Sequence, residues 1–442
     1  MEPNSTDIFD LKKCRNTLNE QDFCTRQGRI NKVVGMTIEA TGLVCSIGDV
    51  CLITPERGSG VIEAEVVGLE SDHVFLMPYR DTDGVGYGCA VVNTGSRMMV
   101  KVSDEMIGRT IDALGKPLDG GPPIEKGTKV PIDNTPPNPM ERPPITEVIE
   151  MGVKAIDGLM TIGKGQRMGI FAGSGVGKST LMGMIARNVK ADINVIALVG
   201  ERGREVVEFI ERDLGEEGKK RSVLVVATSD QPSLMRHKCA QTATAIAEYF
   251  QQQGKDVLLM MDSLTRFCMA QREIGLATGE APVARGYTPS IYSALPRLLE
   301  RSGNFKTGSI TGIYTVLVEG DDTNEPIADT VRSIIDGHIF LSRKIASSNH
   351  YPAIDVLNSL SRLMSGIADE EHKEAAGKMR NMMSIYRDNE DLISIGAYKP
   401  GANPVVDGAV SHQKKINDFL QQRVDEKFEF DEMLTQLKQA VI

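Results

Sequence analysis

The chain has 442 residues, of which 41% are apolar and 25% charged, with no tryptophan. These proportions are those of ordinary globular proteins, and they exclude a disordered chain, a collagen-like chain and a small disulfide-stapled domain. At roughly 100–200 residues per domain, the length predicts two to four domains. Lysine and arginine number 50 against 60 aspartate and glutamate, a formal net charge of −10. This acidic balance disfavours binding of nucleic acid or anionic lipid over the whole surface.

Cysteine usage and the start of the chain bear on its location. Seven cysteines are present, at positions 14, 24, 45, 51, 89, 239 and 268, without the paired spacing of a metal site. We therefore expect reduced thiols, as in a cytosolic protein. The first residues lack the apolar core of a signal peptide, and no run approaches the ~18 apolar residues that a membrane span needs. The sequence predicts a cytoplasmic protein, peripheral to a membrane only through partners.

Residues 1–24 are polar except at a few positions, among them Ile8, Leu11 and Leu18. Those three recur near helical spacing after Asp7, a suitable N-cap, which predicts a short amphipathic helix. A helix of this size cannot bury a core of its own, so it either docks on a partner or is a frayed tail.

From residue 25 to 96 the pattern changes, and apolar residues alternate with polar ones, as in VIEAEVV. Turn signals such as Gly58-Ser59-Gly60 separate these runs. The pattern predicts several short strands in a small β-barrel or β-sandwich.

A proline- and glycine-rich stretch, residues 115–145, is expected to be an extended connection over a surface. Beyond it, nearly continuous apolar runs such as INVIALVG and DVLLMMD alternate with helical patterns over residues 178–189, 202–214 and 234–253. Such runs are typical of parallel strands buried on both faces, so residues 97–365 are expected to form an α/β domain.

The last part of the chain, residues 366–442, has helical patterns alone. Helices are expected over residues 369–390, 403–424 and 428–441, with GAYKPGANP as the break between the first two. The sequence therefore predicts a separate helical domain at the C-terminal end.

The strongest motif follows the strand RMGIF and opens a helix. It comprises Gly173, Ser174, Gly175, Val176, Gly177, Lys178, Ser179 and Thr180. Glycines let the backbone turn its N–H groups around phosphate oxygens, and the helix N-terminus adds partial positive charge. Lys178 would reach the β- and γ-phosphates of a nucleotide, and the Ser179 hydroxyl would coordinate Mg²⁺. The strict pattern begins with glycine where this chain has Ala172, and a tight turn that merely contains Lys-Ser is the alternative.

Two acidic residues are expected at the same sheet edge. Asp262 ends the apolar run LLMMD, where it would face the phosphate loop and hold Mg²⁺ through water. An aspartate that caps the next helix is the alternative. Glu201 follows INVIALVG and is placed to orient an attacking water. A solvated glutamate at a helix start is equally consistent with this spacing, because acidic residues favour helix N-termini.

Longer segments resemble a known family. AIDGLMTIGKGQRMGIFAGSGVGKST, LVGERGREV, LLMMDSLTRF and HYPAIDVLNSLSR are similar to the hexameric RecA-like ATPases of the rotary ATP synthase group. Within that group, ERGREVVEFIERDLGEEG and VLVEGDDTNEPIADTVRSIIDGHIFLSR resemble the flagellar protein export ATPases, with virulence-type secretion ATPases as the nearest confusion. The resemblance implies an N-terminal β-barrel, a RecA-like α/β core with a P-loop, and a C-terminal helical domain.

The resemblance also implies roles for single residues. Glu201 matches the general base of catalytic subunits, whose non-catalytic partners carry glutamine there. Arg202 and Arg266 match arginines near the γ-phosphate, although Arg202 could instead pair with Glu205.

Two further residues lie in the last of these segments. Tyr351 matches the tyrosine that stacks on adenine, and Arg362 matches the finger that reaches a neighbouring subunit's nucleotide. A packing role for Tyr351 and a surface ion pair for Arg362 are the alternatives.

By resemblance, the chain is a Mg²⁺-dependent ATPase that forms a homohexamer and energises flagellar protein export. The implied partners are a regulatory stator-like protein at residues 1–24, a central stalk-like protein, the export gate at the inner membrane and chaperone–cargo complexes. No nucleic acid is expected. The alternatives are a virulence secretion role with the same chemistry, a non-catalytic nucleotide-binding ring subunit, and a ring translocase on nucleic acid. Glu201 disfavours the non-catalytic subunit, and the acidic balance disfavours the translocase.

Overall fold

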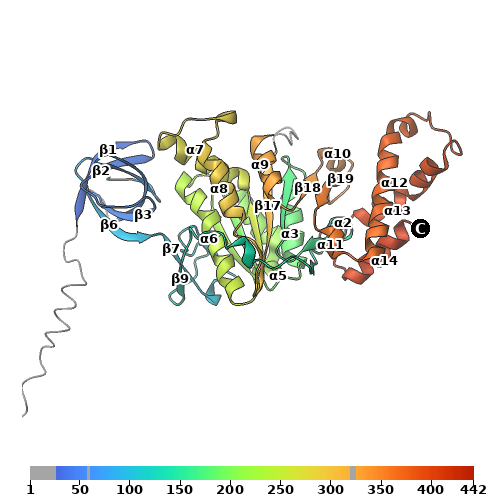
Figure 1. Cartoon of the computed structure of the whole chain (residues 1–442), viewed down its shortest axis with the longest axis horizontal. Coiled ribbons are helices and arrows are strands. Elements are labelled where there is room, and N and C mark those ends of the chain that lie inside the picture. The colour runs from blue at the N-terminus through green and yellow to red at the C-terminus, as the bar shows by residue number, and fades with distance from the viewer. Residues whose placement is uncertain (1–25, 57–59, 319–324) are drawn as a thin grey trace, which may run out of the picture. The chain divides into compact units, whose positions relative to one another are not determined.

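The computed structural model describes residues 26–56, 60–318 and 325–442, and it divides into two units, Met1–Met98 and Met99–Ile442 (Figure 1). The helix expected near the start of the chain falls in residues 1–24, outside the described residues. Among the described helices, none combines the length and apolar character needed to cross a bilayer.

The described part of the first unit is a closed β-barrel, which decides between the barrel and the sandwich. Its strands run in the order β1-β2-β5-β4-β3-β6. They are β1 (Gln27–Val34), β2 (Thr37–Thr41), β3 (Asp49–Thr54), β4 (Ile62–Glu70), β5 (His73–Pro78) and β6 (Ala90–Arg97). Every second residue points inward, so Ile30, Ile38, Ile53 and Leu76 form a dry core. Closure pairs every strand with two neighbours and leaves no free sheet edge.

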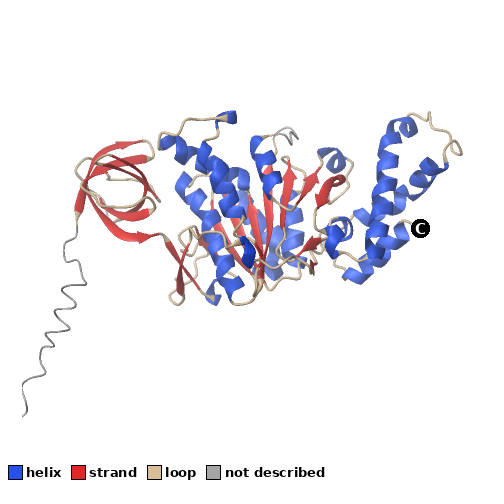
Figure 2. Cartoon of the chain, in the orientation of Figure 1, coloured by secondary structure: helices blue, strands red, loops and turns tan. Residues whose placement is uncertain are grey.

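The second unit contains a large sheet whose strands follow the order β19-β18-β12-β17-β15-β13-β14-β8 (Figure 2). They are β8 (Thr110–Asp112), β12 (Arg167–Ala172), β13 (Ile193–Val199), β14 (Ser222–Ala227), β15 (Asp256–Asp262), β17 (Ser309–Leu317), β18 (Gly337–Leu341) and β19 (Ile354–Ser361). The pairs from β18 to β8 are parallel, whereas β19 runs antiparallel to β18. A short strand, β16 (Gly303–Asn304), pairs with β17.

Helices lie on both sides of this sheet (Figure 2). They are α2 (Lys154–Leu159), α3 (Lys178–Asn188), α4 (Gly203–Glu208), α5 (Gly215–Lys219), α6 (Ser233–Gln252), α7 (Leu264–Ala277), α8 (Pro289–Leu299), α9 (Pro326–Ile334) and α10 (Arg343–Ser347). The helix expected over residues 202–214 is interrupted, because α4 passes into a π-helical stretch over Phe209–Leu214. Since both faces are covered, β13 and β14 are buried at every residue, as their unbroken apolar runs predict.

The proline- and glycine-rich connection is more structured than expected. Residues 115–145 include β9 (Thr128–Pro131), which pairs with β7 (Met99–Val102), and a 3₁₀ turn over Pro139–Glu141. Ile124 and Ile132 in this stretch are buried. The composition excludes a central strand, but it does not exclude a two-stranded ribbon held by buried isoleucines. The remaining short elements are β10 (Val148–Ile149), β11 (Ile162–Gly163) and 3₁₀ turns over Asp104–Met106 and Ala284–Gly286.

The C-terminal region is helical, as expected. It comprises α11 (Met364–Ile367), α12 (Glu370–Ser394), α13 (Pro404–Leu420) and α14 (Phe430–Ala440). Asp369 and Asn403 cap α12 and α13 through their side chains. The second helix ends at Leu420 rather than 424, because Gln422 turns inward and binds the sheet region, donating from its backbone N–H to the Tyr351 carbonyl at 3.1 Å.

Candidate functional site

The predicted phosphate loop joins the carboxyl end of β12 to the start of α3. Gly175 and Gly177 have positive φ angles of 78° and 87°, a backbone conformation that a side chain would strain. Gly177 precedes Lys178, the first residue of α3, and makes no side-chain cap. The first N–H groups of α3 are therefore left for a ligand, as a helix N-terminus that binds phosphate requires.

A cavity of about 640 Å³ opens over this loop. It is lined by Ala172, Gly173, Ser174, Gly175, Gly177, Lys178, Ser179, Thr180, Glu201, Arg202, Asp262 and Arg266, among others. The fold thus brings together most of the predicted site residues, from the carboxyl ends of β12, β15 and β13, with β17 between the first two. Val176 is buried beneath the loop, and Tyr351 and Arg362 lie outside the cavity lining.

Lys178 is the electrostatic centre of the site. Its Nζ contacts Asp262 Oδ1 and lies 3.5 Å from Glu201 Oε1. Burial would lower the pKa of the Lys178 ammonium, but the charges of Asp262 and Glu201 outweigh burial and raise it. A cation held between two carboxylates at this edge can exchange them for phosphate oxygens, which carry the same sign of charge.

Asp262 does not cap the helix that follows it. Ser263 does so instead, accepting a hydrogen bond from the Arg266 N–H at 3.3 Å. Asp262 faces the cavity and accepts a second hydrogen bond, from Thr315 Oγ1 at 2.7 Å. Sequence reasoning missed Thr315, although a threonine inside the apolar run of β17 was a signal that a buried hydroxyl has a partner nearby.

Glu201 is buried, with 9% of its surface exposed, so it is not a solvated residue at a helix start. Its Oε1 atom, 3.5 Å from Lys178 Nζ, is buried and makes no hydrogen bond to any described residue. Burial first, and then the negative charge of Asp262, raises the pKa of Glu201 to about 7, and Lys178 opposes the rise. A carboxylate with this pKa in a polar cavity is suited to act as a base near neutral pH.

The two predicted arginines differ. The Arg202 side chain is largely exposed, and its NH1 lies 3.8 Å from Glu205 Oε1, the pairing noted above as an alternative. Arg266 lies against the backbone of Gly200, and its buried Nε has no hydrogen-bond partner among the residues that the structure describes. A buried N–H without an acceptor destabilises the fold unless a ligand accepts a hydrogen bond from it. Arg266 is therefore better placed than Arg202 to bind an anion.

Tyr351 and Arg362 lie at different places. The Tyr351 ring is partly exposed and packs beside Gly177, where an added Cβ would be 3.5 Å from two ring carbons. Arg362 follows β19, is exposed, and donates to the Arg332 carbonyl at 3.4 Å. The structure therefore places Tyr351 next to the phosphate loop but does not bring Arg362 to the cavity of its own chain.

The side chains at the cavity include donors that suit a magnesium ion. The Ser179 hydroxyl and the Asp262 carboxylate both line it, and Mg²⁺ prefers such hard oxygen ligands. Among the described residues, the buried Oε1 of Glu201 pairs with Lys178 at 3.5 Å but makes no hydrogen bond, so it can still accept one from a ligand. The residues present thus fit a bound cation together with phosphate oxygens.

Comparisons with known proteins agree with this geometry. The nucleotide-binding domain model of the ATP synthase alpha/beta family matches residues 152–361, and the beta-barrel domain model of that family matches residues 30–95. The model of the T3SS EscN ATPase C-terminal domain matches residues 368–439. Their order along the chain confirms the predicted barrel, α/β core and helical C-terminal domain.

Relatives match over nearly the whole chain. A flagellum-specific ATP synthase from Bacillus subtilis (strain 168) is 56% identical over 94% of this chain and 95% of its own length. A type 3 secretion system ATPase from Xanthomonas euvesicatoria is 50% identical over 92% of both. The structure of the assembled ATPase EscN, from the type III secretion system of enteropathogenic E. coli, aligns with a TM-score of 0.89 at 45% identity, covering 94% of this chain and 100% of that one. The chain therefore belongs to the family of flagellum-specific ATP synthases and type III secretion ATPases, and it is an ATPase.

Proposed function

We propose that this ATPase hydrolyses Mg²⁺-bound ATP to energise flagellar protein export. The site assignment rests on Lys178, which lies between the buried carboxylates of Asp262 and Glu201 beside a phosphate loop. The flagellar role is supported by the 56% identity to a flagellum-specific relative, against 50% to a type 3 secretion relative. A non-catalytic ring subunit is not favoured, because Glu201 supplies a carboxylate where such subunits carry glutamine.

The chemistry assigns a separate task to each group. Lys178 leaves its carboxylates and binds the β- and γ-phosphates, while the N–H groups of the loop bind the remaining oxygens. Glu201, freed from Lys178, accepts a hydrogen bond from the attacking water and orients it toward phosphorus. Arg266 and Arg202 contact the γ-phosphate, where negative charge redistributes. Ser179, and Asp262 through water, would hold magnesium, which would supply further positive charge.

Two residues outside the cavity complete the site. The Tyr351 ring, beside Gly177, stacks on the adenine base. Arg362 stabilises the transition state at a neighbouring subunit's γ-phosphate, which accounts for its exposure and for its distance from its own cavity. The active form is accordingly a ring, a homohexamer in which each interface contains one complete site.

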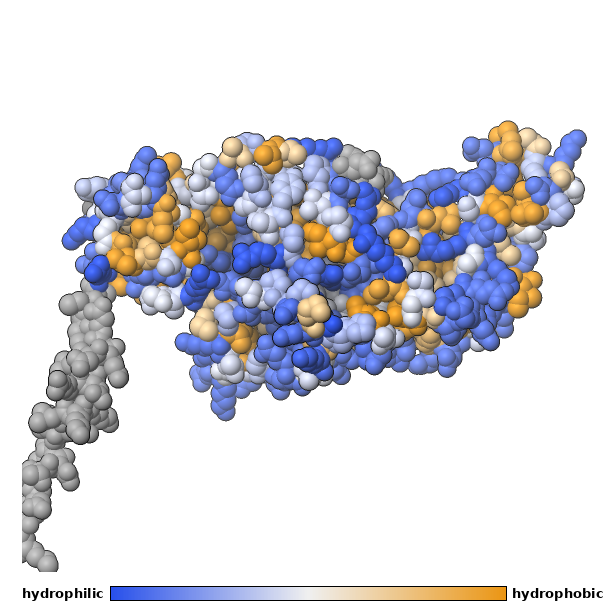
Figure 3. All heavy atoms as spheres, viewed as in Figure 1, coloured by the Kyte–Doolittle hydropathy of each residue, from blue (hydrophilic) through white to orange (hydrophobic). Residues whose placement is uncertain are grey.

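Partners follow from the same relationship. EscN is solved in complex with its central stalk EscO, and we propose a stalk-like partner for this chain. Figure 3 shows apolar residues at the far end of the C-terminal helices, where Leu392, Ile395 and Val405 are exposed. Such a patch suits the export gate or chaperone–cargo complexes at the inner membrane. A regulatory stator-like protein would bind residues 1–24.

The export role is tested in the organism that carries the chain. Deleting its gene should abolish secretion of flagellar subunits and motility, and the wild-type gene should restore both. Glu201→Gln should accumulate normally and fail to restore them, while Glu216→Gln, an exposed glutamate on α5, should succeed. A deletion strain that secretes flagellar subunits at the parental level would overturn the proposal.

The proposed stator contact has its own test. A chain lacking residues 1–20, or carrying Leu11→Asp, should bind nucleotide normally but fail to capture the stator-like partner in a pull-down. Capture of that partner at wild-type affinity by the shortened chain would show that the segment is only a tail.

A further inference from the structure

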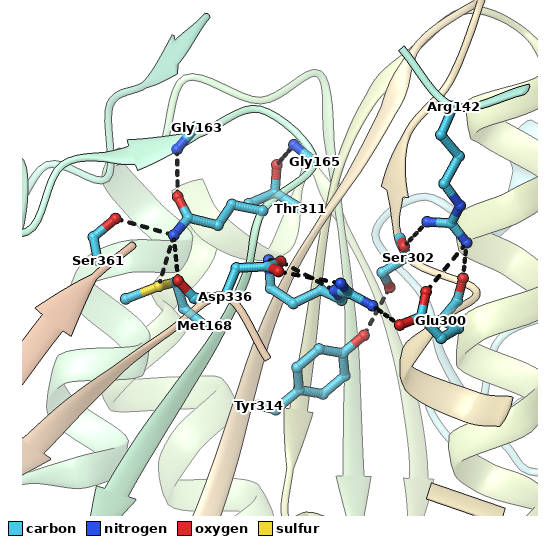
Figure 4. Close-up of polar contacts among 12 residues, drawn as sticks. Arg142, Gly163, Gly165, Met168, Glu300, Ser302, Thr311, Tyr314, Asp336 and Ser361 are labelled. Carbon is cyan, nitrogen blue, oxygen red and sulfur yellow. Dashed lines mark hydrogen bonds and ion pairs between the residues drawn. The ribbon is translucent and has the colours of Figure 1, made fainter. Parts of the chain in front are cut away.

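A buried polar network lies at the amino edge of the sheet, the edge opposite the phosphate loop (Figure 4). Its centre is Gln166, which has no exposed surface and immediately precedes β12. The Gln166 Oε1 accepts from the Gly163 N–H at 2.8 Å. Its Nε2 donates to the Asp336 carbonyl at 3.2 Å and to Ser361 Oγ at 3.0 Å. One side chain therefore joins the start of β12 to the segments before β18 and at the end of β19.

Asp336 is fixed a second time, through its carboxylate. Arg167 donates to it from Nε at 3.0 Å and from NH2 at 3.1 Å, and the Arg167 backbone N–H adds a third bond at 3.0 Å. Two parallel bonds from a planar guanidinium set the direction of the carboxylate as well as its distance. Both the side chain and the main chain of Asp336 are thus tied to β12.

Arg362 is attached to this network through its backbone. Its N–H donates to the same Asp336 carbonyl at 3.0 Å. The preceding residue, Ser361, is held on both sides, because its hydroxyl donates to the Thr161 carbonyl at 2.8 Å and accepts from Gln166. Beyond this anchored backbone, the Arg362 side chain extends into the exposed region.

We infer that Gln166, Arg167 and Asp336 are positioning residues that set where Arg362 projects, an inference that rests on the proposed action of Arg362 on a neighbouring subunit's nucleotide. Six residues of β12, about 20 Å of strand, separate this anchor from the phosphate loop. The same strand therefore carries a subunit's own nucleotide loop at one end and, at the other, the support of the group that serves the next subunit. Misplacement of a reacting group by ~1 Å costs about 10²-fold in rate, so the anchor bears directly on turnover.

The competing explanation is that Gln166 only stabilises β12 and, through it, the phosphate loop of its own chain. Mixed rings separate the two explanations, because they place the defect in one subunit and the working loop in another. Gln166→Leu removes the polar contacts, and Ser361→Ala is a gentler change on the finger's own strand. Each is mixed with Lys178→Ala chains, whose loop is inactive and whose Arg362 is intact. Tyr314→Phe is the matched control, since it removes one buried hydrogen bond to Ser302 in the same region.

We expect Gln166→Leu alone to bind Mg·ATP normally and to hydrolyse it about 10- to 100-fold more slowly, with a smaller loss for Ser361→Ala. Tyr314→Phe should stay near the wild-type rate. In rings that mix Gln166→Leu chains with Lys178→Ala chains, about a quarter of the interfaces combine the working loop of the first with the intact anchor of the second. Those interfaces should restore part of the activity. No return with Lys178→Ala, while Arg362→Ala chains do recover in the same mixture, overturns this inference alone. Failure of both mixtures overturns the proposed role of Arg362 itself. Rates within twofold of wild type for both folded variants also overturn the inference.

Discussion

Similar sets of charged side chains lie near the two ends of β12, but the two sets differ in how firmly they are held. At the carboxyl end, Lys178 lies between Asp262 and Glu201. At the amino end, Arg167 lies between Asp336 and Glu300, with ion pairs of 3.0 and 2.5 Å. Each set therefore has one basic side chain and two carboxylates, and the six residues of β12 lie between the two sets.

The difference lies in how firmly each cation is held. Arg167 is bound by a rigid fork of parallel hydrogen bonds and by its own backbone N–H, so it has one geometry. Lys178 is a point charge on a flexible stem, and its ion pairs with Asp262 and Glu201 have no such fork to fix their direction. The same charges thus form a fixed support where arginine holds them and an exchangeable site where lysine does.

The largest effect is expected at Arg362, which the amino end supports. Arg362→Ala should bind Mg·ATP as the wild type does, yet hydrolyse it about 10³- to 10⁵-fold more slowly, the usual contribution of such a finger. Steady-state hydrolysis and equilibrium binding of a fluorescent nucleotide measure the two quantities. Arg387→Ala, at an exposed position on α12, is the control and should keep its rate. An Arg362→Ala chain with full activity would exclude the finger.

The next effect is expected at the carboxyl end. Glu201→Gln keeps the shape of the site but loses the carboxylate that we propose orients water, so hydrolysis should fall by about 10²- to 10⁴-fold. Nucleotide affinity should remain. Glu300→Gln, at the other end of β12, should hydrolyse ATP at nearly the wild-type rate. Comparable losses in both variants would mean that the two ends do not differ as described.

For the free energy of unfolding, the amino end of β12 should matter more than the carboxyl end, the reverse of the order expected for hydrolysis by Glu300→Gln and Glu201→Gln. Asp336→Asn breaks the fork to Arg167 and should lower the free energy of unfolding by about 1–3 kcal/mol, as expected for a charged hydrogen bond. Asp262→Asn should cost less, because Lys178 keeps Glu201 as a partner and one of two adjacent carboxylates is removed. Urea denaturation midpoints of the two variants test this, and a larger loss for Asp262→Asn would contradict it.

The smallest effect concerns pH. Because the Glu201 pKa is raised to about 7, kcat/KM should fall about tenfold per pH unit below that value, as the carboxylate becomes protonated. Glu205 adds to the rise, so Glu205→Gln should move this acid limb a few tenths of a pH unit lower. An unchanged or higher apparent pKa in Glu205→Gln would show that Glu201 does not control the limb.

The same shift has a consequence for stability. The folded-state pKa of Glu201 exceeds the ordinary value of 4.5, so protonation favours the folded state. The stabilisation of the folded state that comes from this raised pKa is fully present below pH 4.5 and is lost as the pH rises through about 7. Glu201→Gln should therefore lose less stability than the wild type over this interval, which denaturation at several pH values would show.

Much of this architecture could be predicted from local patterns. Buried parallel strands, the phosphate loop and the C-terminal helices each leave a periodic or compositional signal within ten to twenty residues. Barrel and sandwich could not be separated, because alternation records which face is buried and not whether the first and last strands meet. The ribbon of β9 and the inward turn at Gln422 depend on partners elsewhere in the chain.

The residues of the site also divide into those that local patterns predict and those that depend on distant partners. Lys178 and Asp262 could be placed from the strands that precede them, since carboxyl ends of parallel strands share one edge. Thr315 and Gln166 could not, because each acts through a side chain distant in sequence: Thr315 binds Asp262, and Gln166 binds Ser361. A buried threonine or glutamine indicates that a hydrogen-bond partner exists, but it does not identify that partner.

In the proposed ring, each chain alone holds an incomplete site, which a neighbour's Arg362 completes. The most direct measurement is the specific ATPase activity of the wild-type chain over a wide range of protein concentrations, with assembly state and nucleotide binding followed in parallel. Specific activity should rise steeply as rings assemble, while dilute single chains still bind Mg·ATP. Dilute single chains that hydrolyse ATP at the full specific activity would contradict the claim.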